Sequence, residues 1–229
     1  MKKVLAILLI LSTAIAFASC GTDVHAKSEG TLTYEQFVAA ELESEVVIEA
    51  FVQAKQSWWD NKATVYTQDK DGAYFLYNMA CSEEDYAKLT VGTKIKVKGY
   101  KSEWAGEVEI TDATFEILEG SYTAKAVDAT SWLDTDELIK HQNQLVSFKG
   151  MTIESISYKN NEPGDDIYVD ASINNKTYSF CVEAYLTGPD TDLYKTVCDL
   201  KKGDKVDIEG FLYWYNGANP HITAVTKAN

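Results

Sequence analysis

Two stretches of the chain share one pattern: VGTKIKVKGYKSEWAG at Val91–Gly106 and KKGDKVDIEGFLYWYNG at Lys201–Gly217. Each has a glycine near its start, then charged and aliphatic residues in alternation, then two further glycines. The glycines of the second stretch follow those of the first by 111 residues: Gly92 and Gly203, Gly99 and Gly210, Gly106 and Gly217. Because alternation with a period of two predicts a strand, the chain contains the same strand-centred unit twice.

Five strands are expected in each unit. In the first unit they are expected at 45–56, 62–68, 73–79, 93–101 and 107–117, and in the second at 145–158, 165–173, 176–183, 204–214 and 220–226. A short helix is expected between the third and fourth strands, at 82–89 and 190–199. A helix is also expected before each first strand, where Thr33 and Gln36 match a capping box and where the second copy continues through 134–141.

Five strands with one helix between the third and fourth follow the order of the OB-fold. The Gly-x-Lys-x-x-Val-x-Gly stretch that opens the fourth strand resembles the OB-fold domains of bacterial exported proteins, over 45–118 and 145–226. The resemblance implies an all-β chain of two tandem five-stranded OB-like barrels. We expect the first domain at 33–120, a linker at 121–131 and the second domain at 132–229. Gly99 and Gly210 lie inside strands, where glycine permits a bulge.

The N-terminus has the features of an export signal. Lys2 and Lys3 precede an apolar stretch that is too short to span a bilayer well. Phe17-Ala18-Ser19-Cys20 then resembles the lipobox of bacterial lipoproteins, which implies a signal peptide at 1–19, an acylated Cys20 and a flexible tether at 20–32. Ordinary secretion with cleavage after Ala18 is the alternative. The expected location is outside the cytoplasm, as a membrane-anchored lipoprotein that faces the cell surface or the periplasm.

The charge of the chain is strongly acidic. It has 21 Lys and no Arg against 35 Asp and Glu, a formal net charge of −14. Affinity for nucleic acid comes from clustered positive charge, and an acidic chain is repelled by phosphates. Nucleic acid is therefore expected to be an unlikely partner.

No catalytic set is recognisable in the sequence. The three histidines, His25, His141 and His221, have no neighbouring nucleophile motif, and Asp69–Gly72 begins like an EF-hand loop but lacks its other ligands. The chain is expected to be non-enzymatic, without metal or cofactor. Cys181 and Cys198 could form a disulfide in an export compartment; two reduced thiols are the alternative.

The aromatic residues are the candidate ligand-binding groups. OB-folds bind ligands over strands two and three and between the loops that follow strands one and four. The residues at those positions are Trp58, Trp59, Asp60, Asn61, Tyr66, Tyr77 and Trp104 in the first unit and Tyr158, Tyr168, Tyr178, Trp214 and Tyr215 in the second. Side chains of successive residues on a strand point to opposite faces, so at most one of Trp58 and Trp59 can easily pack into the core. The alternative is that these rings only cover barrel ends or fill cores.

These features together predict a lipid-anchored envelope protein that binds carbohydrate or another envelope component on its aromatic edges. The alternative is a structural or protein-interaction component of an envelope complex. Binding of single-stranded nucleic acid is the least favoured of the three.

Overall fold

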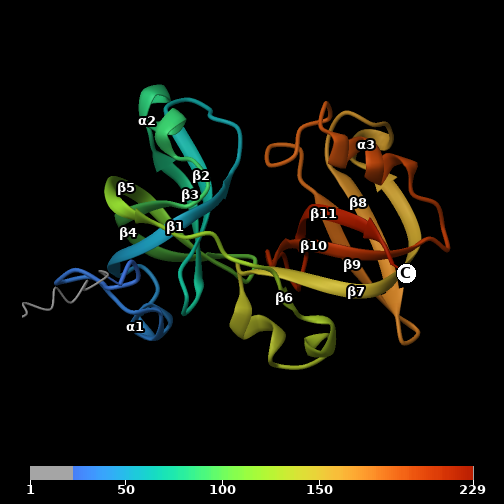
Figure 1. Cartoon of the computed structure of the whole chain (residues 1–229), viewed down its shortest axis with the longest axis horizontal. Coiled ribbons are helices and arrows are strands. Elements are labelled where there is room, and N and C mark those ends of the chain that lie inside the picture. Colours follow the sequence, from blue (N-terminus) through green and yellow to red (C-terminus); the bar gives the residue numbers. More distant parts are fainter. Residues whose placement is uncertain (1–22, 229) are drawn as a thin grey trace, which may run out of the picture.

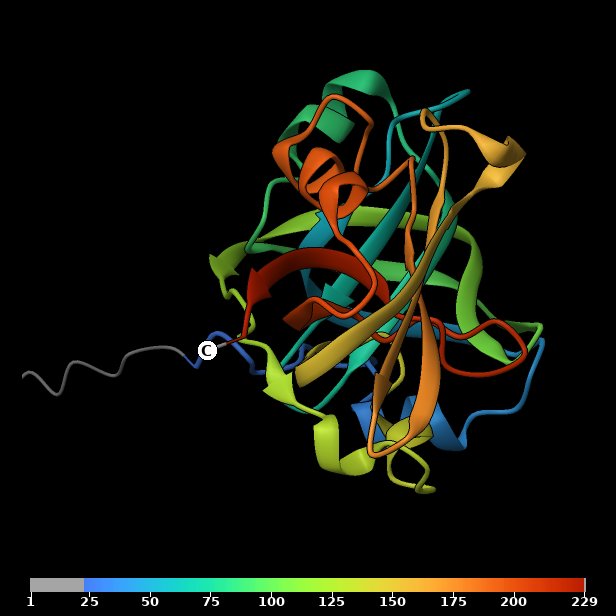
Figure 2. The ribbon, with the colours of Figure 1, turned by 90° about the vertical axis from the view of Figure 1, so that its right-hand side faces the viewer.

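The computed structural model describes residues 23–228, which form a closed β-barrel and a second β-sheet (Figure 1). The expected signal peptide at 1–19 and the lipidation site Cys20 lie outside the described residues. Figures 1 and 2 show the helices α2 and α3 at the same end of the molecule.

The barrel contains the first repeat. Its strands are β1 (Glu45–Lys55), β2 (Lys62–Gln68), β3 (Ala73–Ala80), β4 (Thr93–Trp104) and β5 (Glu107–Ser121), hydrogen-bonded in the closed order β1-β2-β3-β5-β4. Helix α2 (Glu83–Lys88) joins β3 to β4, and β3 runs parallel to β5. This topology is that of an OB-like barrel. Helix α1 (Tyr34–Ala39) precedes it and begins with the expected capping box of Thr33 and Gln36.

The second sheet contains the other repeat. Its strands are β6 (Val127–Asp128), β7 (Leu145–Tyr158), β8 (Ile167–Ile173), β9 (Lys176–Val182), β10 (Lys205–Phe211) and β11 (His221–Lys227). They are ordered β10-β11-β9-β8-β7-β6, with an additional pairing between β10 and β7. Helix α3 (Asp192–Asp199) lies between β9 and β10, and short 3-10 helices are η1 (Thr130–Trp132), η2 (Leu138–His141) and η3 (Lys159–Asn161).

The α-helix expected around 134–141 does not form. Only the short 3-10 helix η2 is present there. No side chain caps it. Asp134, which the sequence places at the start of this helix, instead accepts hydrogen bonds from Lys176 Nζ at 2.9 Å and Tyr178 Oη at 2.6 Å. A helix start without a capping side chain is less stable, so the segment stays short.

The repeated glycines have the bulge role that the sequence predicts. The β4–β5 register shifts beside Gly99, and the β10–β11 register shifts at Gly210. A Cβ at Gly99 would lie 2.8 Å from the carbonyl oxygen of Thr111, and one at Gly210 would lie 2.3 Å from that of His221. Only glycine allows the strands to approach this closely.

A shared apolar cluster joins the barrel to the second sheet. Each sheet has its own core, and a third cluster consists of Tyr66, Phe75 and Phe211. The rings of Tyr66 and Phe211 stack at a centroid distance of 4.4 Å. Aromatic rings that are buried in this way make the boundary between the two sheets well packed.

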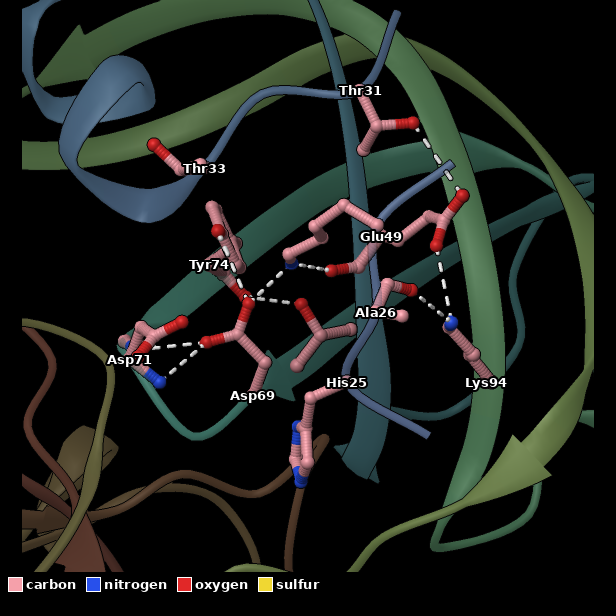
Figure 3. Close-up of polar contacts among 12 residues, drawn as sticks. His25, Ala26, Thr31, Thr33, Glu49, Asp69, Asp71, Tyr74 and Lys94 are labelled. Atoms are coloured by element: carbon pink, nitrogen blue, oxygen red, sulfur yellow. Dashed lines mark hydrogen bonds and ion pairs between the residues drawn. The ribbon is translucent and has the colours of Figure 1, made fainter. Parts of the chain in front are cut away.

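Within the segment expected as a tether, Lys27 and Ser28 contact the barrel. Lys27 Nζ contacts the carboxylate of Asp69 and the carbonyl oxygen of Glu49. Figure 3 shows Asp69, Glu49 and Lys94 in this network of polar contacts. Lys94 Nζ donates to the carbonyl oxygen of Ala26 at 3.0 Å and pairs with Glu49 at 3.1 Å. The carboxylates of Asp69 and Glu49 are almost fully buried. The sequence did not show that Lys27 pairs with Asp69 or that Lys94 pairs with Glu49.

A candidate ligand groove between the barrel and the second sheet

A groove of about 510 Å³ lies where the barrel meets the second sheet. The barrel contributes 56–59 of the β1–β2 connection, Lys62 of β2, and the β3 residues Phe75 and Tyr77. The second sheet contributes Glu183 and Tyr185, which follow β9, and Tyr213 and His221. The backbone N–H of Ser57 donates to the carbonyl oxygen of Tyr185 at 2.8 Å, which fixes the two sides relative to each other.

A tight hairpin turn presents Trp59 at the rim. Trp59 and Lys62 exchange backbone hydrogen bonds of 3.2 and 2.8 Å, and Asp60 and Asn61 between them have positive φ values of 46° and 57°. A two-residue turn with positive φ at both positions is type I′. Trp58 also lines the groove, but its Nε1 donates to the carbonyl oxygen of Cys81 at 2.9 Å and the ring is only partly exposed. The period of two therefore separates the two indoles, and Trp59 is left 77% exposed.

Three exposed rings surround the groove. Besides Trp59, the groove is lined by Tyr185, which is 62% exposed, and by Tyr77, which is 44% exposed. Lys62 lies beside them and has no ion-pair partner among residues 23–228. This arrangement can stack planar rings and place one cation near them.

The floor of the groove is polar and mostly buried. His221 is 6% exposed, and its Nδ1 lies 2.8 Å from the hydroxyl of Tyr66. Burial lowers the pKa of His221 to about 3, so the imidazole is neutral. Its ring stacks on Tyr213 at 4.3 Å. Burial also raises the pKa of Glu183 to about 7, although the backbone N–H groups of Tyr185 and Leu186 donate to its carboxylate.

Two further buried carboxyls lie near this boundary. Glu107 of β5 is fully buried and accepts from Asn143 Nδ2 at 2.5 Å and from the backbone N–H of Trp214 at 2.8 Å. Burial raises its pKa to about 8 and that of Glu109 to about 7. At neutral pH these groups carry less negative charge than the sequence count assigns to them.

The other aromatic candidates lie elsewhere. Tyr66 is fully buried between the sheets and does not reach the groove surface. Trp104 and Tyr215 form a separate pair at 5.2 Å, and the half-buried Trp214 packs against the core of the second sheet. Tyr158, Tyr168 and Tyr178 lie on the second sheet outside the groove lining.

Asp60 and Asn61 form the turn and face a neighbouring pocket that they share with Tyr77. Of the candidates, the structure therefore brings only Trp58, Trp59 and Tyr77 together in the groove.

The sequence did not predict any of the four groove residues that come from the second repeat: Glu183, Tyr185, Tyr213 and His221. Glu183 and Tyr185 follow β9, Tyr213 follows β10, and His221 begins β11. They contact the first repeat only because the two sheets pack together. Tyr213 carried a local signal, since it lies in the aromatic run FLYWYN of the repeated stretch. The second sheet buries His221.

Three further observations concern the cysteines, possible metal ligands and the helices. Cys81, Cys181 and Cys198 are free thiols in this structure. Within residues 23–228, no group of three or more His, Cys, Asp or Glu side chains is arranged to hold a metal ion. None of the helices in this range has the length and apolar character that crossing a membrane requires.

No protein-family model and no curated protein sequence matches the chain. Solved structures do match at low identity. A murine DNA-binding protein bound to double-stranded DNA matches with a TM-score of 0.40 and 12% identity, over 80% of this chain and 96% of that one. A replication protein A heterotrimer bound to single-stranded DNA matches with a TM-score of 0.30 and 13% identity, over 78% of this chain and 50% of that one.

The asparaginyl-tRNA synthetase from Pyrococcus horikoshii, complexed with asparaginyl-adenylate, matches with a TM-score of 0.30 and 15% identity. The match covers 37% of this chain and 19% of the synthetase, so the chain spans about a fifth of that protein. Similarities at this level concern the fold.

Two predictions from the sequence are corrected here. The sequence favoured a carbohydrate or envelope component as ligand, with a role in an envelope complex as the alternative, and it treated nucleic acid as an unlikely partner. The similar structures include complexes with double-stranded and single-stranded DNA, so the glycan and envelope assignments are withdrawn and nucleic acid is no longer set aside. Net charge sums the whole chain and does not describe the groove.

Proposed function

We propose that this chain is a non-enzymatic binding protein that takes single-stranded nucleic acid in the groove between the barrel and the second sheet. The observation that carries the proposal is the set of three exposed rings, Trp59, Tyr77 and Tyr185, around one groove. Unpaired bases stack on such rings irrespective of sequence, each contributing about 1–3 kcal/mol. The groove lies over β2, β3 and the β1–β2 connection, the surface that OB-folds use for oligonucleotides.

The charges in the groove determine how much of the affinity comes from phosphate contacts and how much from stacking. Lys62 is the lysine that lines it, and Glu183 in its floor is close to half-protonated at neutral pH. Few phosphates can therefore be neutralised, and stacking has to supply most of the affinity. The slope of log K against log salt is about −0.7 for each phosphate contact with a single strand. We expect a shallow slope of about −1.

The test is binding of a fluorescent thymidine oligonucleotide to the protein, measured by anisotropy at several salt concentrations. Trp59→Ala should weaken binding by about 1–3 kcal/mol, which is roughly five- to 150-fold in Kd. Tyr100→Ala is the matched control, because Tyr100 is also an exposed aromatic residue but lies outside the groove. Absence of binding at low salt, or equal losses in both variants, would contradict the proposal.

We also propose that the second sheet is a second OB-like barrel. The pairing of β7 with β10 supports this, because it joins the first and fourth strands of that repeat as β1 and β4 are joined in the first. Helix α3 also occupies the same place in the strand order as α2.

Export and lipid anchoring at Cys20 complete the proposal, and the sequence Ala18-Ser19-Cys20 supports them. Expression with a radiolabelled fatty acid should label the wild-type protein and leave Cys20→Ser unlabelled. Equal labelling of the two forms, or none, would contradict the anchor and leave the groove proposal untouched.

A further inference from the structure

The hydroxyl of Tyr66 determines which nitrogen of His221 carries the proton. Tyr66 is fully buried, and among the described residues its hydroxyl has one hydrogen-bond partner, His221 Nδ1 at 2.8 Å. If Nδ1 were the donor, the hydroxyl proton of Tyr66 would be buried without an acceptor, which is costly. Tyr66 therefore donates, Nδ1 accepts, and the proton of the neutral imidazole is on Nε2.

The ring of His221 is held in place from two sides. It stacks on Tyr213 with an interplanar angle of 26°, and its backbone is paired with Cys181 at the start of β11. Burial keeps the imidazole neutral throughout the physiological range. The direction in which Nε2–H points is consequently fixed before any ligand arrives.

The Nε2–H group is available to a ligand. His221 lines the groove, and Nε2 has no hydrogen-bond partner among residues 23–228. The unpartnered side-chain atoms that are sealed from solvent in this range are His25 Nδ1 and Asn143 Oδ1, and Nε2 is not one of them. The groove thus contains this donor as well as the exposed rings of Trp59 and Tyr77.

We infer that His221 is the specificity-determining residue of the groove and donates from Nε2 to a carbonyl oxygen of a base that stacks on the rim. The inference rests on the proposed function. A carbonyl oxygen projects about 1.2 Å beyond the ring that bears it, so it reaches a donor in the floor while the ring stays stacked. Adenine has no carbonyl, and its ring nitrogens are recessed. The groove therefore prefers thymine and uracil to adenine.

The experiment compares three oligonucleotides of equal length: thymidine, deoxyadenosine, and a thymidine analogue whose bases are difluorotoluene, an apolar ring of the same shape. The wild-type protein should bind the thymidine oligomer about tenfold more tightly than the other two, which is the upper range of one hydrogen bond. His221→Phe should abolish this preference while retaining the binding that comes from stacking. His221→Gln, which keeps a side-chain N–H, should restore part of it.

A second variant controls for misfolding of His221→Phe. In His221→Phe the hydroxyl of Tyr66 loses its acceptor, so the double variant Tyr66→Phe/His221→Phe removes both partners and leaves no unsatisfied group. Its circular dichroism and unfolding midpoint should resemble those of the wild type, and its preference for thymidine should be absent.

The outcomes separate the two proposals. If thymidine binds and Trp59→Ala weakens it, but His221→Phe keeps the full preference over difluorotoluene, the role of His221 is refuted and the groove function stands. If the wild type binds none of the oligomers, both are refuted.

Discussion

Trp104 and Tyr215 occupy the same position in the two repeats, and their rings pack against each other at a centroid distance of 5.2 Å. The next residues also meet, because the backbone N–H of Asn216 donates to the carbonyl oxygen of Ala105 at 2.7 Å. Equivalent loops thus contact each other, as equivalent surfaces do in a two-fold dimer. The two repeats use the same loop to hold the barrel against the second sheet.

Replacing Trp104 with alanine should therefore loosen that contact. An aromatic pair contributes about 0.5–1.5 kcal/mol beyond the area that it buries, and we expect a loss of that size in the free energy of unfolding in urea. Val91→Ala is the control, since Val91 is also exposed but belongs to no such pair. A Trp104→Ala protein as stable as the Val91→Ala protein would show that the pair contributes nothing.

Lys27 is expected to be important for stability although it precedes every helix and strand. Its removal in Lys27→Met leaves the carboxylate of Asp69, which is 1% exposed, without its cation. Breaking a buried ion pair from one side costs about 3 kcal/mol or more. Urea unfolding should show this loss, and Lys27→Met/Asp69→Asn should recover part of it.

Lys88→Met provides the comparison for Lys27, because Lys88 pairs with Glu84 at the exposed surface. Surface pairs contribute little, so this variant should unfold like the wild type. Equal losses in the Lys27 and Lys88 variants would contradict the importance of burial.

Glu109 should make stability depend on pH. Burial raises its pKa to about 7 in the folded chain, whereas an unfolded chain releases this proton near a pH of about 4.3. Between these values the folded state holds a proton that the unfolded state has lost, so stability falls as pH rises from about 4 to about 7. Glu109→Gln should reduce this decline, measured as the free energy of unfolding at pH 5 and pH 7.5.

Part of the decline in stability should remain in the Glu109→Gln protein, because burial also raises the pKa of Glu107 and of Glu183. Glu116→Gln, an exposed change on the same strand, should keep the wild-type slope. A Glu109→Gln protein with an unchanged slope would mean that Glu109 is ionised in the folded chain.

The bulge at Gly210 gives the sharpest local test. In Gly210→Ala the new Cβ would lie 2.3 Å from the backbone oxygen of His221, which cannot move away without breaking the β10–β11 pairing. We expect a loss of about 2 kcal/mol or more in unfolding free energy. Gly188→Ala adds the same group where no atom lies within 4 Å, and thermal unfolding should place it near the wild type. Similar midpoints for the two variants would refute the steric argument.

The strands could be predicted from the sequence because the pattern that encodes them is local. The expected 62–68 and 145–158 match β2 and β7 as observed, and the helix expected at 82–89 contains α2. Period-two alternation and turn residues are properties of neighbours in the chain. The failure at 134–141 has the opposite cause, since Asp134 bonds to Lys176 and Tyr178, more than 40 residues away.

The candidate site could be predicted only in part for the same reason. Trp59 and Tyr77 were found because the first repeat alone predicts their positions. The floor was not found, because Tyr66 and His221 are 155 residues apart and no local pattern relates them. The position of Tyr66 depends on which face of the barrel the second sheet covers, and the sequence does not encode that in any short segment.

The attachment of Lys27 to Asp69 and Glu49 limits how far the barrel can travel from an anchor. Lys27 follows Cys20 by seven positions, and an extended chain spans at most about 3.6 Å per residue. With acyl chains on Cys20, the point of attachment on the barrel would remain within about 25 Å of the lipid headgroups. The protein would then sample a thin shell above the membrane, and a strand of nucleic acid would have to enter that shell to be captured.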